Sequence, residues 1–260
     1  MKSIISTLLA LFCTAGIAFG QANAPINSKS ENFFNKNMDY ELQAFFSIGG
    51  SSPLGFPREI REIKSYNPSL QLGLEANATK WLDPKQKWGI RVGVSIEGKG
   101  METEAGVENY FTEIIQDNSG VQGYFTGTVK TDVKNVFVTV PISAVYNISD
   151  HWNLLAGLFV SYLIDEQFDG YVSDGYFRPG APTSPKVTFS GDSKAAYDFS
   201  DDERSFQWGA QIGAERIIGK HLAVMGNLSY GINDIFKKDF NSITFNMHNI
   251  YVDLGFSYRF

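Results

Sequence analysis

The chain has 260 residues and a formal net charge of −6, and aromatic residues make up 14% of it. The aromatic content excludes a disordered chain, and the acidic balance argues against nucleic acid as a partner. The longest charge-free stretches of the body, residues 135–149 and 151–164, are shorter than the roughly 20 residues that a spanning helix needs. A multi-helix membrane protein is therefore excluded, and the 25 glycines favour β structure.

The first residues have the pattern of a secretory signal. A short basic start precedes the apolar run Ile4–Phe19, and small residues follow it. This pattern predicts a signal peptide over residues 1–20, with cleavage before Gln21 or just after Ala22. The one cysteine, Cys13, follows the bulky Phe12, which argues against a lipid anchor. The polar residues 21–38 are expected to form a periplasmic N-terminal tail.

Residues 39–260 alternate between apolar and polar or small residues, which is the period of a β-strand with two different faces. The last segment is the clearest, because Ile250, Val252 and Leu254 alternate with Tyr251 and Asp253. Eight strands are predicted on this basis, near residues 41–48, 70–76, 89–98, 136–148, 152–164, 206–216, 222–233 and 250–260.

The connections between these strands alternate in length. Tight turns are expected at Asp83–Lys87, Ser149–His151 and Gly219–Lys220, and long joins at Ser51–Ser65, Met101–Thr131, Glu166–Glu203 and Phe236–Thr244. An even number of antiparallel strands with short turns at one end and long loops at the other is typical of outer-membrane barrels. We therefore expect an all-β fold: an eight-stranded antiparallel up-and-down transmembrane β-barrel with short periplasmic turns and long extracellular loops.

The charges of the strands lie on the face opposite to the apolar row. A charge on a lipid-facing row would cost about 2–4 kcal/mol at the middle of the bilayer, so the charged row is expected to point into the lumen. A soluble barrel with an apolar interior is the alternative. Tryptophans beside the short turns, Trp81, Trp88 and Trp152, favour the membrane, where they would form an interfacial girdle. The predicted lumen charge network comprises Glu41, Glu75, Arg91, Glu97, Glu215, Asp253 and Arg259.

The terminal run Tyr251–Phe260 and the central segments Val140–Ile142 and Leu155–Tyr162 resemble the PorT-like outer-membrane β-barrel proteins of gram-negative bacteria. The resemblance covers residues 39–260 and implies a cell-surface β-barrel that is integral to the outer membrane. It also implies that Phe260 is the terminal signal by which the barrel-assembly machinery recognises its clients. The other interpretation is that Phe260 completes the lipid-facing row.

Sequence signals for catalysis or metal binding are weak. His151 and His221 lie beside short turns and His248 lies near the opposite end of a strand, so the three histidines of the chain should not converge on a metal ion. His248 with the nearby Ser242 is a weak candidate for a lipid-modifying site. We therefore expect no catalytic, cofactor-binding or metal-binding residues, no cofactor and no enzyme activity.

The lumen and the long loops remain as candidates for function. In a narrow barrel, buried charges have to be paired, so we expect the network to plug the lumen, with Arg91 and Arg259 as its organisers. A cation-preferring pathway is the alternative. In the loops, Tyr171, Tyr176 and Phe177 are candidates for contact with a ligand, because aromatic rings give large contact area at small entropic cost. Residues 101–131 are expected to extend as a hairpin above the membrane.

These observations predict a structural or surface-binding, adhesin-like outer-membrane protein that acts through its extracellular loops. A small channel, or an accessory barrel of a secretion or transport complex, is the alternative. The expected partners are outer-membrane lipid and lipopolysaccharide, the barrel-assembly machinery, and an extracellular ligand or partner protein of unknown identity.

Overall fold

The computed structural model describes residues 36–55, 57–116 and 119–260. Residues 37–260 form one compact unit. The predicted signal peptide and most of the predicted tail lie outside the described residues.

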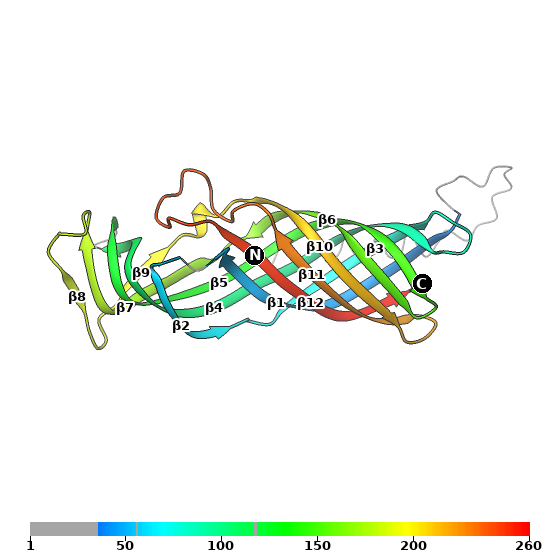
Figure 1. Cartoon of the computed structure of the whole chain (residues 1–260), viewed down its shortest axis with the longest axis horizontal. Coiled ribbons are helices and arrows are strands. Elements are labelled where there is room, and N and C mark those ends of the chain that lie inside the picture. Colours follow the sequence, from blue (N-terminus) through cyan, green and yellow to red (C-terminus); the bar gives the residue numbers. More distant parts are fainter. Residues whose placement is uncertain (1–35, 56, 117–118) are drawn as a thin grey trace, which may run out of the picture. The chain divides into compact units, whose positions relative to one another are not determined.

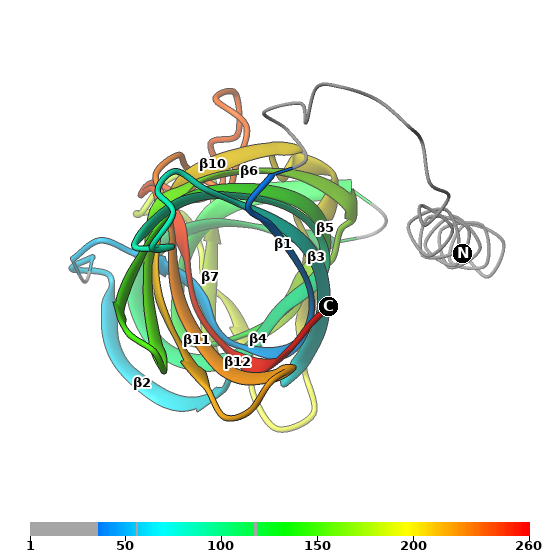
Figure 2. The same cartoon turned by 90° about the vertical axis from the view of Figure 1, so that its right-hand side faces the viewer.

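Eight strands of this unit pair into a closed antiparallel ring (Figures 1 and 2). Neighbours in the ring are also consecutive ring strands along the chain, so the topology is up-and-down. Each of the eight predicted strands is found in the ring. The ring strands are β1 (Met38–Pro53), β3 (Gln71–Trp81), β4 (Trp88–Gln116), β5 (Ser119–Ser149), β6 (Trp152–Asp165), β10 (Phe206–Ile217), β11 (Leu222–Gly231) and β12 (Met247–Arg259).

The ring closes where the first and last strands meet. β1 pairs with β12 in one continuous register from Glu41 opposite Arg259 to Pro53 opposite Met247. Because this ladder joins the two ends of the meander, neither end strand of the ring is left with an unpaired edge along this ladder.

The two faces of the ring strands differ in the way the alternation predicts. Large apolar side chains such as Leu72, Ile142 and Phe256 are exposed on the outside. The opposite row, which includes Arg91 and Glu215, is buried inside the ring. The interpretation as a soluble barrel with an apolar interior is therefore wrong, because the interior row is polar and the apolar row faces outward.

The short turns and long joins gather at opposite ends of the ring. Residues 82–87, 150–151 and 218–221 connect ring strands at one end, which we call the turn end, and the C-terminus lies there too (Figure 1). Of the three tryptophans predicted to form a girdle there, Trp88 and Trp152 are exposed. Trp81 is only 2% exposed, so its placement in a girdle was wrong. Its indole donates a hydrogen bond to Asp39 at 2.7 Å, which draws the ring inward.

Beyond the other end of the ring, which we call the loop end, the chain is also built of strands. The β4–β5 hairpin continues to Gln116 opposite Ser119, so the predicted hairpin extension is confirmed. It is flanked by strands that the sequence left inside the long joins: β2 (Ile60–Asn67) pairs with β4, β7 (Phe168–Pro179) with β5, and β8 (Val187–Phe189) and β9 (Ala195–Asp198) with β7.

Helix contributes little to the described part of the chain. It contains the short 3-10 helix η1 (Ser200–Asp202). No helix among the described residues is long and apolar enough to cross a membrane.

The alternation of β4 reverses between the ring and the loop end. In the ring, Arg91 and Glu97 point inward and Val92 points outward. Further along the same strand, Met101 and Val107 occupy the inward row and are buried. The outward row there carries Glu102, Glu104 and Glu108 instead of apolar residues. The surroundings of the outer face therefore change from apolar to aqueous near Lys99–Met101.

The close approach of β1 and β12 depends on a glycine that lies opposite the aromatic side chain of Phe45. Phe45 on β1 lies directly across from Gly255 on β12 and from Gly73 on β3. A Cβ on Gly255 would come within 2.2 Å of the Ala44 carbonyl oxygen and 2.6 Å of the Phe45 Cα. Both neighbours are backbone atoms and cannot move aside easily.

We expect Gly255→Val to lower the free energy of unfolding by about 1–3 kcal/mol, because overpacking forces the closing strands apart. The measurement is the urea concentration at which the heat-modifiable folded band is lost on a gel. Leu254→Val, one residue away on the exposed outer row, is the control and should leave the midpoint nearly unchanged. Equal midpoints for both variants would contradict the close packing at Gly255.

Candidate functional site

Arg91 is the centre of the charged interior near the turn end. Its guanidinium donates to Glu41 of β1 at 2.7 Å, to both carboxylate oxygens of Glu215 of β10, and through Nε to Thr79 of β3 at 2.9 Å. Side chains from three other strands therefore meet on this arginine of β4. Its planar fork of donors suits this arrangement, because several N–H groups can serve two carboxylates at once.

Arg259 joins the network at its turn end. It lies near the end of β12, partly exposed, donates to Asp39 at 2.9 Å and forms an ion pair with Glu41 at 3.7 Å. The contacts at the centre of the network are made by Arg91, so the two arginines act at different places. Asp39 was not among the predicted network residues, because it lies at the predicted boundary of the barrel.

A second charged level, formed by Lys99 and Glu97, lies closer to the loop end. The Lys99 side chain is about as buried as Arg91, at 4% exposed, and its ammonium is 2.9 Å from the Glu97 carboxylate. Glu97 also accepts a hydrogen bond from Thr139 at 2.6 Å. The ammonium lies over three aromatic rings, at 5.4 Å from Phe137, 5.4 Å from Phe159 and 5.6 Å from Tyr251. Such cation–π contacts strengthen when they are desolvated.

Sequence reasoning missed Lys99 although a signal was present. Lys99 continues the inward odd-numbered row of Arg91 and Glu97. The predicted strand ends at Gly98, where the regular apolar alternation stops, so the next inward residue was left out of the strand.

The remaining two predicted network residues lie between these levels. Asp253 accepts hydrogen bonds from Ser47 at 2.7 Å and from Asn227 at 3.2 Å, and Glu75 accepts one from Asn77 at 2.7 Å. These partners are neutral. The seven predicted residues therefore do not form one ion-pair network. They form two charged levels, and between them lie two carboxyl groups whose hydrogen-bond partners are neutral side chains.

Little free space remains inside the ring. A cavity of about 40 Å³ lies between the Arg91 level and Asp253, lined also by Gln43, Glu75 and Asn77. This volume is room for one or two water molecules. At this level the interior of the ring is filled by side chains.

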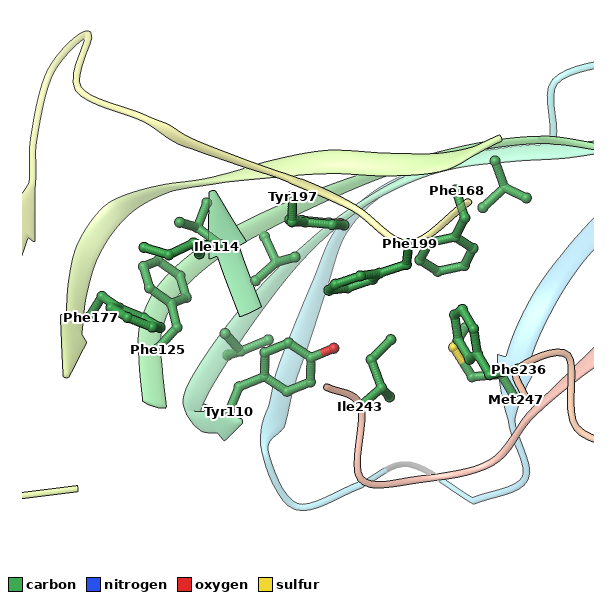
Figure 3. Close-up of a cluster of buried hydrophobic side chains, with 14 of the residues drawn as sticks. Tyr110, Ile114, Phe125, Phe168, Phe177, Tyr197, Phe199, Phe236, Ile243 and Met247 are labelled. Carbon is green, nitrogen blue, oxygen red and sulfur yellow. The ribbon is translucent and has the colours of Figure 1, made fainter. Parts of the chain in front are cut away.

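The loop end is organised by an apolar cluster (Figure 3). Phe168, Phe199 and Phe236 pack ring against ring, with centroids 5.0 Å apart for Phe168 and Phe236. Tyr197 stacks on Phe199 at 5.0 Å. Side chains from β7, β9 and the segment after β11 are thereby joined to the β4–β5 hairpin.

The three predicted contact residues of the loops do not share one surface. Phe177 is 0% exposed and belongs to the apolar cluster, so its prediction as a contact residue was wrong. It alternates with Tyr176 and takes the inward row of β7, which the sequence could not reveal because β7 was not predicted. Tyr171 and Tyr176 stay partly exposed, with the ammonium of Lys194 4.2 Å from the Tyr171 ring and that of Lys186 3.7 Å from the Tyr176 ring.

The histidine and serine considered for lipid chemistry have other partners. His248 is buried, and its Nδ1 lies 3.0 Å from the carbonyl oxygen of Gly231. The Ser242 hydroxyl donates to Glu113 at 3.2 Å. Across residues 36–55, 57–116 and 119–260, no cluster of three or more metal-ligating side chains is found.

Glu203, in the segment between η1 and β10, is a buried carboxyl that the sequence analysis did not single out. Its side chain accepts a hydrogen bond from Asn135 at 2.6 Å. Burial is the main reason that the pKa of Glu203 is raised to about 8; the hydrogen bond from Asn135 opposes this shift, and the Glu166 carboxylate adds to it. The protonated form is therefore the one that the fold favours.

We expect Arg91→Leu to lower the free energy of unfolding by about 3–5 kcal/mol, because it leaves two buried carboxylates without their cation. The measurement is the urea midpoint of the heat-modifiable band. Arg61→Leu is the control, since Arg61 pairs with Glu108 at 2.8 Å with both side chains more than half exposed. Its loss should cost less than about 1 kcal/mol. An unchanged midpoint for Arg91→Leu would count against a stabilising role of the Arg91 level.

We expect the segment around Glu203 to become less stable as the pH rises from about 5 to about 8. The folded-state pKa of about 8 lies above the ordinary value of 4.5, so the stabilisation is complete below pH 4.5 and is lost as the pH rises through 8. The measurement is the rate of proteolytic cleavage after the adjacent Arg204 in the parent chain, divided by the rate in Glu203→Gln at each pH. A ratio that does not rise with pH would contradict the shift.

Comparison with known protein families identifies the family of this chain. The family model described as outer membrane protein beta-barrel domain matches residues 16–237. The structure of Ail, the attachment invasion locus protein of Yersinia pestis, is similar with a TM-score of 0.38 and 10% identity, over 86% of this chain and 97% of that one. The structure of OprG from Pseudomonas aeruginosa is similar with a TM-score of 0.35 and 15% identity, over 85% of this chain and 95% of that one.

The translocator domain of the autotransporter NalP from Neisseria meningitidis gives a TM-score of 0.25 and 10% identity, over 100% of this chain and 98% of that one. No curated protein matches the chain. The family match covers most of the chain and agrees with the closed ring of strands and its exposed apolar row. The chain belongs to the outer membrane protein beta-barrel domain family, and it is an integral transmembrane β-barrel of the outer membrane of a gram-negative bacterium.

Proposed function

We propose that this protein is a non-conducting, non-enzymatic barrel that presents a binding surface to an extracellular partner protein at its loop end. In this proposal the turn end faces the periplasm and the loop end faces the outside. PorT-like membership within the wider family, and recognition of the exposed Phe260 by the barrel-assembly machinery, are parts of the same proposal.

The two charged levels support a closed lumen. Arg91 is bound to residues of three other strands, and Lys99 is enclosed by Glu97 and three aromatic rings. An ion crossing the barrel would have to break these contacts at both levels. Each contact is made in a space with little water, where separating the charges is costly.

The ordered extension of the loop end supports a binding role, and it is the observation that carries the proposal. Its strands continue the sheet of the barrel, and its core is packed with aromatic rings. Binding to such a surface requires little ordering of the chain, which is the main entropic cost of using loops for recognition.

The chemistry of this surface favours a protein partner. Tyr171 and Tyr176 are held under the ammonium groups of Lys194 and Lys186, which limits the freedom of their rings. β8 is the last strand of its sheet and pairs with β7 alone, so its outer edge can accept a strand from another chain. Aromatic rings beside an open strand edge suit recognition of an extended peptide segment.

Outer-membrane lipid and lipopolysaccharide are the remaining proposed contacts. The exposed apolar row of the ring supports them, since it includes Ile90, Leu158 and Phe256. Phe260 is 77% exposed, and its amide donates to the Tyr40 carbonyl at 3.1 Å. The aromatic side chain therefore ends the outer row beside β1 and stays accessible.

The experiment compares intact cells that display the parent chain with cells that display a variant in which residues 181–193 are replaced by a short Gly-Ser linker. Biotinylated surface proteins of neighbouring cells are the probe. We expect bound probe to fall at least tenfold with the shortened variant while the barrel still shows its heat-modifiable band. Tyr176→Ser should lower binding as well, whereas Lys134→Ser, on an exposed strand face nearer the ring, should not. Equal binding by all four chains would overturn the proposal.

Conductance measurements distinguish the proposed closed barrel from the alternative, a small channel. Purified protein in planar bilayers should give no unitary current steps if the two charged levels close the lumen. Regular steps in the parent chain would favour a small channel, and this result does not depend on the loop surface.

A further inference from the structure

A large cavity lies at the loop end, apart from the charged levels. Its volume is about 390 Å³, within the range of small-molecule sites. Within the described residues, no charged side chain lines it. The walls are mostly apolar, and they include Ile63 of β2, Met101 of β4, Phe199, Met247 and Ile250 of β12.

The cavity has an opening in the side wall between β1 and β2. The β1–β3 ladder ends at Ser47 opposite Gln71, and above that point β1 pairs with β12 while β2 pairs with β4. The described ladders do not join β1 to β2. A hydrogen bond links the two strands here: the Tyr66 hydroxyl donates to the Gly49 carbonyl at 2.8 Å. Consecutive residues Gly49–Pro53 line the cavity, so it reaches both faces of β1.

Met101 closes part of this gap from the side of β4. Its sulfur lies 2.5 Å from the point where a Cβ on Gly50 would be, so the thioether rests directly on the β1 backbone. Only a glycine leaves room for this contact. A flexible, unbranched thioether can change rotamer at small cost, which suits a side chain that has to move aside for a ligand.

The mouth of the cavity is continuous with the lipid-facing surface. Ile250 lines the cavity and belongs to the same outward row as the exposed Val252 and Leu254. Ile63, on the other side of the mouth, is 47% exposed. Apolar side chains therefore lead from the lipid-facing surface to the edge of the cavity.

The shape of the cavity indicates an extended ligand. Its lining follows β4 from Met101 to Thr112, which spans roughly 30 Å at ~3.3 Å per residue, so the cavity is elongated along the strand. At the end of the cavity that is farther from Met101, the hydroxyl of Tyr110 points between Phe199 and Ile243 (Figure 3). One polar atom can be accommodated there.

We propose that this cavity binds a single linear hydrocarbon chain, which enters sideways between β1 and β2 from the lipid-facing surface. The chain belongs either to an outer-leaflet lipid or to a free aliphatic molecule, since both present the same apolar methylene surface. Binding buries methylene groups against the apolar wall, and no charge on the wall has to be desolvated.

The test uses the purified full chain in lipid nanodiscs with two photoactivatable probes. One is a sixteen-carbon alcohol with a diazirine near the end of its chain, and the other is a phospholipid with the same diazirine in one acyl chain. We expect covalent labelling of peptides that contain residues 101–112 or 243–247. Labelling by the lipid probe alone assigns the site to an acyl chain, and labelling by the alcohol alone assigns it to a free aliphatic molecule.

Matched variants separate the cavity from the general lipid contact. Ala105→Trp fills the cavity and should lower labelling of these peptides at least tenfold, whereas Ala144→Trp, on the lipid-facing row of β5, should not change it. If Ala105→Trp does not give the folded, heat-modifiable band, Ile63→Lys at the mouth takes its place, with the exposed neighbour Glu62→Lys as control. Labelling confined to the lipid-facing row, or labelling inside that none of the cavity and mouth variants reduces, would overturn the proposal.

Discussion

The ladder between β1 and β12 is the constraint on which the rest of the structure depends. A bilayer offers no hydrogen-bond partners to backbone groups, so a sheet in lipid must close on itself. Once it closes over eight strands, the inside is so narrow that side chains nearly fill it. The paired charges, the glycines beside Phe45 and the small interior cavity all follow from this closure.

The interior charges are a consequence of the same geometry. Polar residues have to point inward because the outer face meets lipid, and in a narrow ring they come within contact distance of one another. Arg91 satisfies two carboxylates from different strands, and Lys99 is surrounded by one carboxylate and three rings. The contacts that fill the lumen also hold the strands around it together.

Beyond the loop end of the ring, the polarity of the two strand faces is reversed, so that the apolar row points inward and the charged row points outward. With water on the outside, the apolar residues of β4 move to the inward row at Met101, and the charges move outward. The loop end is therefore built like a small soluble domain on a membrane barrel, with its own aromatic core. The large cavity lies at the junction, where an apolar interior meets an apolar outer row through a gap in the wall.

The sequence by itself determined the eight ring strands, the direction of their faces and the positions of the short turns. Period-two alternation is a local property, and in a two-faced sheet it leaves few registers open. Residues such as Arg91, Glu41 and Glu215 could be assigned to the interior for the same reason. The partners within the interior could not, because they come from positions far apart in the chain, 50 apart for Arg91 and Glu41 and 124 apart for Arg91 and Glu215.

Only the tertiary structure decided what lies beyond the ring. β2, β7, β8 and β9 have weak alternation, and their pairing depends on the long β4–β5 hairpin against which they pack. For that reason Phe177 was taken for a surface residue although it is buried. Lys99 was left out of its strand because the apolar alternation of β4 stops at Gly98, although the side chain lies inside the barrel. The side opening between β1 and β2 is likewise invisible to local pattern, because it arises where one ladder stops and another begins.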